Sequence, residues 1–233
     1  MKTVDVCLSP DLIHLYDVTD KVVVVVDILR ATSCMTAGLA SGVKSITPFE
    51  NLEQCQRMKE EGYLIAGERN GEKVEGFDLG NSPFDYMDEK VKGQKVAVTT
   101  TNGTVAIEKS RRAIEVIIGS FLNISSVAKH VLDQKQNVLI LCAGWKGKVN
   151  LEDSLFAGAL VDKIIDKFDY ETDAPLLARA GYLQMKDDLL GQIKNSSHAR
   201  RLNRLNVIKD IEYCLTEDVF TVVPKLVNGE LIA

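Results

Sequence analysis

The first residues that could do phosphate chemistry follow five consecutive valines, in the stretch DILRAT at positions 27–32. Asp27 could bind a hard cation, and Arg30 could hold a phosphate through two parallel hydrogen bonds. An ion pair between Asp27 and Arg30 that only ties down the loop is the alternative. The position two residues after Asp27 is Leu29, so the DxDxT pattern is absent and we expect no aspartyl phosphate of that kind.

A second set of candidates lies in two glycine-rich stretches, at positions 67–71 and 76–83. Glu68 and Asp78 carry the carboxylates that hard cations prefer, while Arg69 and Asn81 offer groups that contact anions. Glycines let the backbone approach a ligand closely. An ordinary solvated loop is the alternative, but polar loops this long inside a compact domain are more often functional.

A third stretch runs from position 99 to 104, where an apolar run leads into small polar residues and then a helical pattern. We predict that Thr100, Thr101, Asn102 and Gly103 cradle a phosphate, because free N–H groups and the positive dipole end meet at a helix start. The stretch lacks the Gly-Lys-Ser/Thr of a P-loop. The alternative is that Asn102 simply caps the helix.

The stretch from position 142 to 153 combines two glycines with Lys146, a candidate anion contact, and ends in Glu152 and Asp153. Asp153 is a candidate metal ligand, although acids at a helix start also stabilise the helix dipole without further function. Cys142 could act as a nucleophile only with a stabilised thiolate, and a buried, inert thiol is the preferred interpretation.

The densest positive charge lies near the C-terminus, at positions 196–204. We predict that Ser197, His198 and Arg200 close over an anion from a helical segment. On a helix Arg200 and Arg204 share a face, whereas Arg201 points elsewhere. A solvated basic face is the alternative.

Short apolar runs precede most of these stretches and predict the strands that position them. The valine run at 21–27 is typical of a strand buried on both faces. Further strands are expected at 4–8, 45–48, 63–66, 95–99, 115–118, 138–142 and 220–223. Helices are expected at 32–40, 51–61, 104–111, 120–132 and 152–168, and 174–215 is largely helical with an interruption around 191–197.

Alternating strands and helices predict an α/β fold with a mostly parallel sheet, helices in flanking layers, a C-terminal helical segment and a terminal hairpin turning at Asn228-Gly229. Residues 1–233 form either a single unit or two α/β lobes with the site in the crevice between them. In open α/β sheets ligands bind beyond the carboxyl ends of the strands, where the candidate stretches lie.

Composition narrows the class of protein. The chain has 233 residues, is 45% hydrophobic and carries a net charge of -5, which argues against nucleic acid as a partner. Residues 1–9 carry two charges and no long apolar run, so we expect no secretory leader and no membrane partner. Five cysteines without a CxxC pair are typical of a reduced protein without structural zinc, and we expect the cytoplasm.

Seven strings in this order carry a family resemblance: VDILRAT, AGERNG, GFDLGNSP, TTTNGT, GSFLN, CAG and SHARRL. The chain resembles the 2-phosphosulfolactate phosphatase family of coenzyme M biosynthesis from about Asp27 to Val223. The resemblance implies a Mg²⁺-dependent hydrolase that converts 2-phospho-3-sulfolactate into 3-sulfolactate and phosphate. Trp145 and Lys146 depart from the small polar residue expected after the CAG string, and the indole would change the shape of the substrate end.

The family's motif acids correspond to Asp27, Glu68, Asp78 and Asp153, which we take as candidate metal ligands. Its basic and amide positions correspond to Arg30, Arg69, Asn81, Asn102 and Arg200. Together with the loops above, this makes Asp27, Arg30 and Glu68 the candidate catalytic residues.

The mechanism we expect is in-line attack by a metal-bound or carboxylate-oriented water, with covalent attack by an aspartate or Cys142 as the lesser alternative. Two other functions stay open: a phosphate-binding module without catalysis, and a phosphatase of another small phospho-hydroxy acid. The sequence leaves the oligomeric state undetermined, and we allow for a homo-oligomer.

Overall fold

The computed structural model describes residues 1–202 and 207–233 as an α/β fold around one large sheet. The strands are β1 (Lys2–Cys7), β2 (Lys21–Val26), β3 (Ser45–Pro48), β4 (Leu64–Arg69), β5 (Glu72–Lys73), β6 (Lys95–Thr99), β7 (Glu115–Gly119), β8 (Asn137–Cys142), β9 (Phe168–Asp169), β10 (Lys225–Val227) and β11 (Glu230–Ile232). The helices are α1 (Ala31–Ala40), α2 (Leu52–Arg57), α3 (Pro83–Tyr86), α4 (Gly103–Lys109), α5 (Ile124–Gln134), α6 (Leu151–Ile164), α7 (Ala174–Met185), α8 (Leu189–Lys194), α9 (Ser197–Leu202) and α10 (Ile208–Cys214).

The sheet has the order β5-β4-β6-β3-β11-β10-β7-β2-β8-β1-β9. Strands β7, β2, β8, β1 and β9 form one parallel run, and β3, β6 and β4 form a second. The terminal hairpin turns at Asn228 and Gly229, which both have positive φ, and pairs antiparallel with β7 on one side and β3 on the other. The predicted fold class is confirmed, while the choice between one unit and two lobes stays a prediction.

Strand β2 supplies side chains to both faces of the sheet. Its alternate valines pack in one hydrophobic cluster with Phe156 and Leu160 of α6, and in a second cluster with Met35 of α1. Each of Val22–Val26 is at most 1% exposed. Because side chains alternate along a strand, a continuous apolar run suits a strand covered on both faces. Burying each valine contributes about 1.5–3 kcal/mol, so β2 holds the residue that follows it, Asp27, firmly in place.

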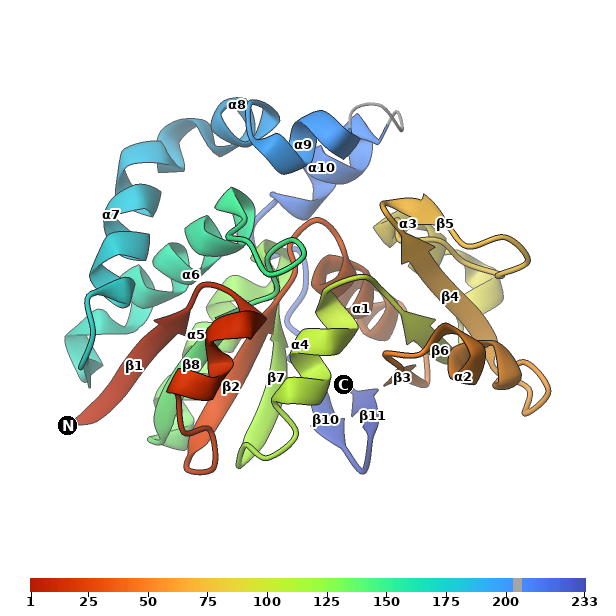
Figure 1. Cartoon of the computed structure of the whole chain (residues 1–233), viewed down its shortest axis with the longest axis horizontal. Helices are drawn as coiled ribbons and strands as arrows, with labels where there is room; N and C mark the ends of the chain where they lie inside the picture. Colours follow the sequence, from red (N-terminus) through yellow and green to blue (C-terminus); the bar gives the residue numbers. More distant parts are fainter. Residues whose placement is uncertain (203–206) are drawn as a thin grey trace.

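The helical segment from α7 to α10 arches over the end of the sheet toward which the arrow of β2 points (Figure 1). Helix α7 packs closely on α6, and a Cβ at Gly158 would lie 2.1 Å from the carbonyl oxygen of Ala178. At the other end of the arch, the rings of Tyr213 in α10 and Phe84 in α3 lie 5.1 Å apart. The arch therefore spans the polar strand ends and is attached on both sides.

Three predicted elements differ from the structure. The strand expected at 220–223 is wrong, because irregular contacts hold this segment: Phe220 donates its N–H to the carbonyl of Leu122, and strand pairing starts only after Pro224, which has no N–H. The helix expected at 152–168 ends at Ile164, and Phe168 begins β9 beside β1. The helix expected at 51–61 ends at Arg57, four residues before the expected end. The largely helical 174–215 is interrupted at Asn195 and Ser196, within the expected range of 191–197.

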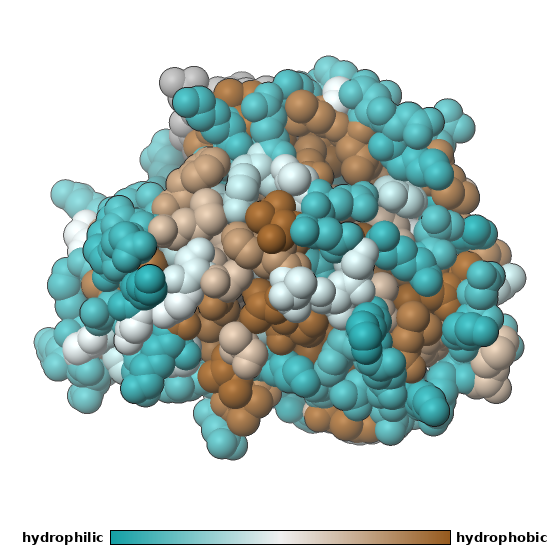
Figure 2. All heavy atoms as spheres, turned by 180° about the vertical axis from the view of Figure 1, so that it is seen from behind, coloured by the Kyte–Doolittle hydropathy of each residue, from teal (hydrophilic) through white to brown (hydrophobic). Residues whose placement is uncertain are grey.

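The surface mixes polar and apolar residues. The face opposite to Figure 1 shows hydrophobic residues interspersed among hydrophilic ones (Figure 2). None of the helices in the described part of the chain has the length and apolarity that a bilayer crossing requires.

Candidate active site

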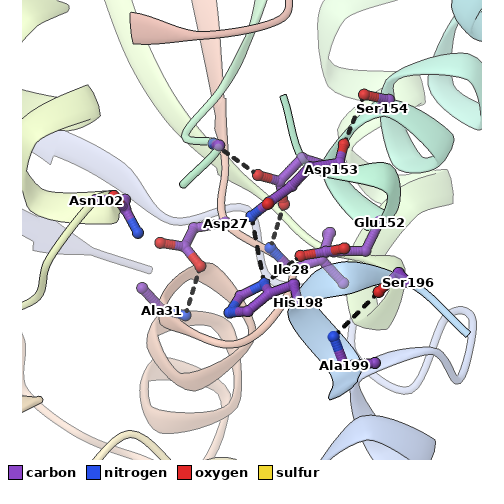
Figure 3. A network of polar contacts seen from close by, with 12 residues as sticks. Asp27, Ile28, Ala31, Asn102, Glu152, Asp153, Ser154, Ser196, His198 and Ala199 are labelled. Carbon is purple, nitrogen blue, oxygen red and sulfur yellow. Dashed lines mark hydrogen bonds and ion pairs between the residues drawn. The ribbon is translucent and has the colours of Figure 1, made fainter. Parts of the chain in front are cut away.

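A cavity lies where the loops after β2, β4, β6 and β8 meet the helical arch. It is lined by Asp27, Leu29, Arg30, Glu68, Gly71, Asn81, Asn102, Trp145, His198 and Leu202. Predicted site residues from the loops after β2, β4 and β6 and from the C-terminal arch therefore lie together, and Trp145 joins them from the loop after β8. Figure 3 shows the polar network on one side of this cavity.

Asp27 stands between the first residues of α1 and of α4. Its Oδ1 accepts a hydrogen bond from the N–H of Ala31 at 3.3 Å (Figure 3). Its own N–H donates to Oγ1 of Thr32 at 3.0 Å. Gly103 lets α4 approach, because a Cβ there would lie 2.8 Å from Oδ2 of Asp27. Burial raises the pKa of Asp27 to about 6; nearby His198 opposes the rise and Glu68 adds to it.

Glu68 joins two loops. Its Oε2 accepts from the N–H of Gly71 and its Oε1 from the N–H of Thr101, both at 2.6 Å, and the side chain is buried. Both oxygens are thus committed to backbone donors, which position the loop after β4 against the loop after β6.

Asp153 also joins two loops through hydrogen bonds to their backbone N–H groups. Its Oδ1 accepts from the N–H of Ile28 and its Oδ2 from the N–H of Gly144, each at 2.9 Å (Figure 3). Burial raises its pKa well above the usual value for an aspartate, and the charges of Glu152 and Asp27 raise it further. The acid at the start of α6 therefore braces the loops after β2 and β8.

The predicted phosphate cradle divides into two parts. Thr100 serves the start of α4, since its Oγ1 accepts from the N–H of Thr104 at 3.1 Å. Asn102 lines the cavity, and its Oδ1 accepts from the N–H of Lys146 at 3.0 Å. Thr101 has a buried Oγ1 without a partner among the described residues.

His198 reaches the cavity from α9. Its Nδ1 contacts Oε1 of Glu152, and the amide of Asn150 lies 3.3 Å from the same nitrogen. The Trp145 ring packs over the imidazole at a centroid distance of 5.3 Å. His198 is 5% exposed and Glu152 is fully buried, so a histidine and a carboxylate form a desolvated pair at the cavity wall.

Arg30 pairs with an acid that sequence reasoning did not single out. Its Nη1 contacts Oδ2 of Asp210 in α10, and its Nη2 donates to the carbonyl of Gly71 at 3.3 Å. Oγ of Ser82 donates to the other Asp210 oxygen at 3.1 Å. The alternative of an Asp27–Arg30 pair is therefore not what holds this loop.

Other predicted residues lie away from the cavity wall. Arg69 donates to Oγ1 of Thr99 at 2.9 Å, and Asp78 pairs with Lys59 at 3.2 Å.

Ser197 and Arg200 are exposed on α9. Arg201, which we expected to point elsewhere, lies 4.8 Å from the Trp145 ring centroid, and Arg204 lies outside the described residues. Lys146 is exposed, and its Nζ donates to Oδ1 of Asn70 at 3.0 Å.

Two acids that contact the cavity residues, Glu152 and Asp210, were not among the candidates predicted from the sequence. Glu152 and Asp210 each contact a predicted residue of the cavity, at separations of 46 and 180 positions. Glu152 lies at a helix start, where stabilisation of the helix dipole already explains an acid. Asp210 lies in a predicted helical segment from which no site residue was chosen. The one available signal was that each lies beside a helix stretch rich in apolar residues, where an acid is buried only with a partner.

Comparison with known proteins decides the family. A family model described as 2-phosphosulpholactate phosphatase matches residues 7–229. The chain belongs to the 2-phosphosulfolactate phosphatase family. It is similar to proteins named probable 2-phosphosulfolactate phosphatase from Thermotoga maritima, at 44% identity over 98% of this chain and 97% of that protein, and from Caldanaerobacter subterraneus subsp. tengcongensis, at 43% over 91% and 90%. The predicted family and the predicted enzyme class, a phosphoric monoester hydrolase, are thereby confirmed.

The use of Mg²⁺ stays a prediction, and the cavity offers a cation only a few protein oxygens. In the described ranges no three His, Cys, Asp or Glu side chains are grouped to hold a metal. Asp27 nevertheless keeps Oδ2 free of protein donors within those ranges, and the buried Oδ1 of Asn81 has no partner there. Mg²⁺ usually keeps several waters and needs only one or two carboxylates, so these two oxygens are the ones that would hold it.

Cys142 is unsuited to attack phosphorus. It is fully buried in β8, and burial raises the pKa of its thiol well above the usual value, with Asp153 adding to the rise. The thiolate, which is the nucleophile, is therefore scarce at neutral pH. This agrees with the preferred interpretation of an inert, buried thiol.

The Arg30–Asp210 pair generates a stability prediction. Asp210→Ala leaves a buried guanidinium without its carboxylate, which we expect to lower the free energy of unfolding by about 3–5 kcal/mol. Glu212→Ala on the same helix removes an exposed partner of Lys194 and should cost less than about 1 kcal/mol. Urea denaturation of both variants measures the difference; equal losses would show that Arg30 does not depend on Asp210.

The raised pKa of Asp27 generates a second prediction. A folded-state pKa near 6, above the ordinary value, means that the protonated carboxyl favours the folded state at low pH, and this contribution is lost as the pH rises through about 6. In metal-free buffer, Asp27→Asn should therefore raise the free energy of unfolding by about 2–3 kcal/mol at pH 8 and change it little at pH 4. Denaturant unfolding at both pH values measures this, and a destabilised variant at pH 8 would contradict it.

Proposed function

We propose that this protein is a Mg²⁺-dependent phosphatase that hydrolyses 2-phospho-3-sulfolactate to 3-sulfolactate and phosphate. The observation that carries the proposal is the placement of Asp27 at a buried strand end, facing a cavity shared with Arg30, Asn102 and His198. Family membership supports a phosphatase over a phosphate-binding module without catalysis.

Asp27 is the metal ligand we favour, with the oxygens of Asn81 and of water beside it. Glu68 lines the cavity and Asp153 does not. Each already accepts two backbone hydrogen bonds and would shape the site around the cation. The bound cation would neutralise charge on the phosphoryl oxygens during transfer. Asp78, paired with Lys59, is the candidate that the geometry supports least.

The remaining charges of the substrate, a carboxylate and a sulfonate, need cationic or amide partners. A recess on the other side of Arg30 is lined by Lys73 and Ser82, and also by Glu72 and Asp85. We propose that Arg30, which borders both the cavity and this recess, holds the acid groups while the phosphate lies near Asp27. Trp145 also lines the cavity, and its indole ring would limit the size of the substrate.

A phosphate-release assay tests the function. With Mg²⁺ present, we expect turnover of 2-phospho-3-sulfolactate at least ten-fold (about 1.4 kcal/mol) above that of phospholactate and phosphoglycolate, because only the sulfonate completes the contacts. Chelation of Mg²⁺ should abolish turnover. In addition, Mg²⁺ should raise the melting temperature of the wild type but not of Asp27→Asn.

Each part of the proposal fails on a separate result. Equal rates on phospholactate would remove sulfonate recognition, and undiminished turnover in a chelator would remove the metal. No release from any small phosphoester would favour a binding module.

A further inference from the structure

We propose that His198 is the proton donor to the oxygen that leaves phosphorus, and that Glu152 is the positioning residue that orients it. The inference rests on the proposed phosphatase function and deepens it. An alkyl phosphate such as a phospho-hydroxy acid releases a strongly basic alkoxide, which leaves far more easily when a proton reaches it during bond cleavage.

The first ground is the orientation of the ring. Glu152, when ionised, only accepts hydrogen bonds, so contact with its Oε1 requires a proton on Nδ1 of His198. Figure 3 shows the other ring nitrogen on the side away from Glu152, toward Asp27 and Asn102. In the described part of the chain that nitrogen has no hydrogen-bond partner, and His198 lines the cavity. Nε2 is therefore the group available to a ligand.

The second ground is that, among the described residues, the side chain of Glu152 contacts only His198 through a hydrogen bond or ion pair. It is fully buried, its Oε1 contacts His198, and its Oε2 has no partner within the described residues. Asp153, by contrast, spends both oxygens on backbone N–H groups. Burying a carboxylate with so few hydrogen bonds is costly, so a pair of this kind is expected where the charge acts on a neighbour, here the imidazole.

The third ground is that the ring is fixed. Trp145 packs on it at 5.3 Å, and the short helix that carries it is capped by Oγ of Ser196, which accepts from the N–H of Ala199 at 3.0 Å. A proton donor that is held by packing on one face and by a carboxylate at Nδ1 needs no reorganisation when the ester bond breaks.

Hydrolysis replaces the bond from phosphorus to the ester oxygen with a bond to the oxygen of water. Water forms the new bond to phosphorus, the bond from phosphorus to the ester oxygen breaks, and its electron pair stays on that oxygen. The ester oxygen takes the proton from Nε2, so an alcohol and dihydrogen phosphate leave a neutral imidazole. The ring then regains a proton from the phosphate or from solvent water.

The test compares leaving groups. His198→Asn keeps an amide that can donate to Glu152 but lacks Nε2. On 2-phospho-3-sulfolactate we expect its kcat to fall by about 10²–10⁴-fold with KM changed little. On acetyl phosphate, a small substrate whose acetate leaves without a proton, the loss should stay below about ten-fold. Glu152→Gln should show the same dependence on the leaving group with a smaller loss.

Four outcomes would overturn the inference. Two of them concern the substrates: His198→Asn loses equal activity on both, or it is as active as the wild type on the alkyl ester. In the third, KM rises and kcat does not fall. In the fourth, Mg²⁺ no longer raises the melting temperature of His198→Asn, which would make Nε2 a metal ligand. If the wild type hydrolyses phospholactate but not 2-phospho-3-sulfolactate, the proposed substrate fails and the same comparison, run on phospholactate, decides the inference.

Discussion

Buried carboxylates need hydrogen-bond donors, and this need organises the loops around the cavity. An ionised carboxylate removed from water without partners costs several kcal/mol. Glu68 and Asp153 meet the requirement with backbone N–H groups of the loops that follow β4, β6, β2 and β8. The two acids therefore hold four loops in register, and the positions of the residues that could contact substrate depend on them.

The same requirement separates two kinds of acid in one cluster. Where both oxygens accept hydrogen bonds from backbone donors, as in Asp153, the side chain holds loops together. Where one oxygen is left over, as in Asp27 and Glu152, the side chain retains capacity for a cation or for a neighbouring imidazole. The raised pKa of Asp27 comes from burial itself, which also raises the pKa of Asp153.

The helical arch brings charged groups to the cavity of an acidic protein. Asp210 of the arch binds Arg30, and His198 of the arch packs against Trp145. The Trp145 ring also lies 5.3 Å from Nζ of Lys146 and 4.8 Å from the guanidinium carbon of Arg201. A net charge of -5 thus coexists with a local concentration of cations beside the place where we propose that a trivalent or more highly charged anion binds.

Local sequence by itself determined the parts that depend on near neighbours. The five valines predicted β2, and the glycine stop after α1 was confirmed by the positive φ of Gly42. The strand-end rule placed Asp27, Asn102 and Asn81 at one cavity. Only the tertiary structure decided which partner each charge takes. Arg30 pairs with Asp210 and His198 with Glu152, and Arg69 and Asp78 turn to other neighbours, because burial and hydrogen-bond satisfaction depend on chain segments that lie far apart in the sequence.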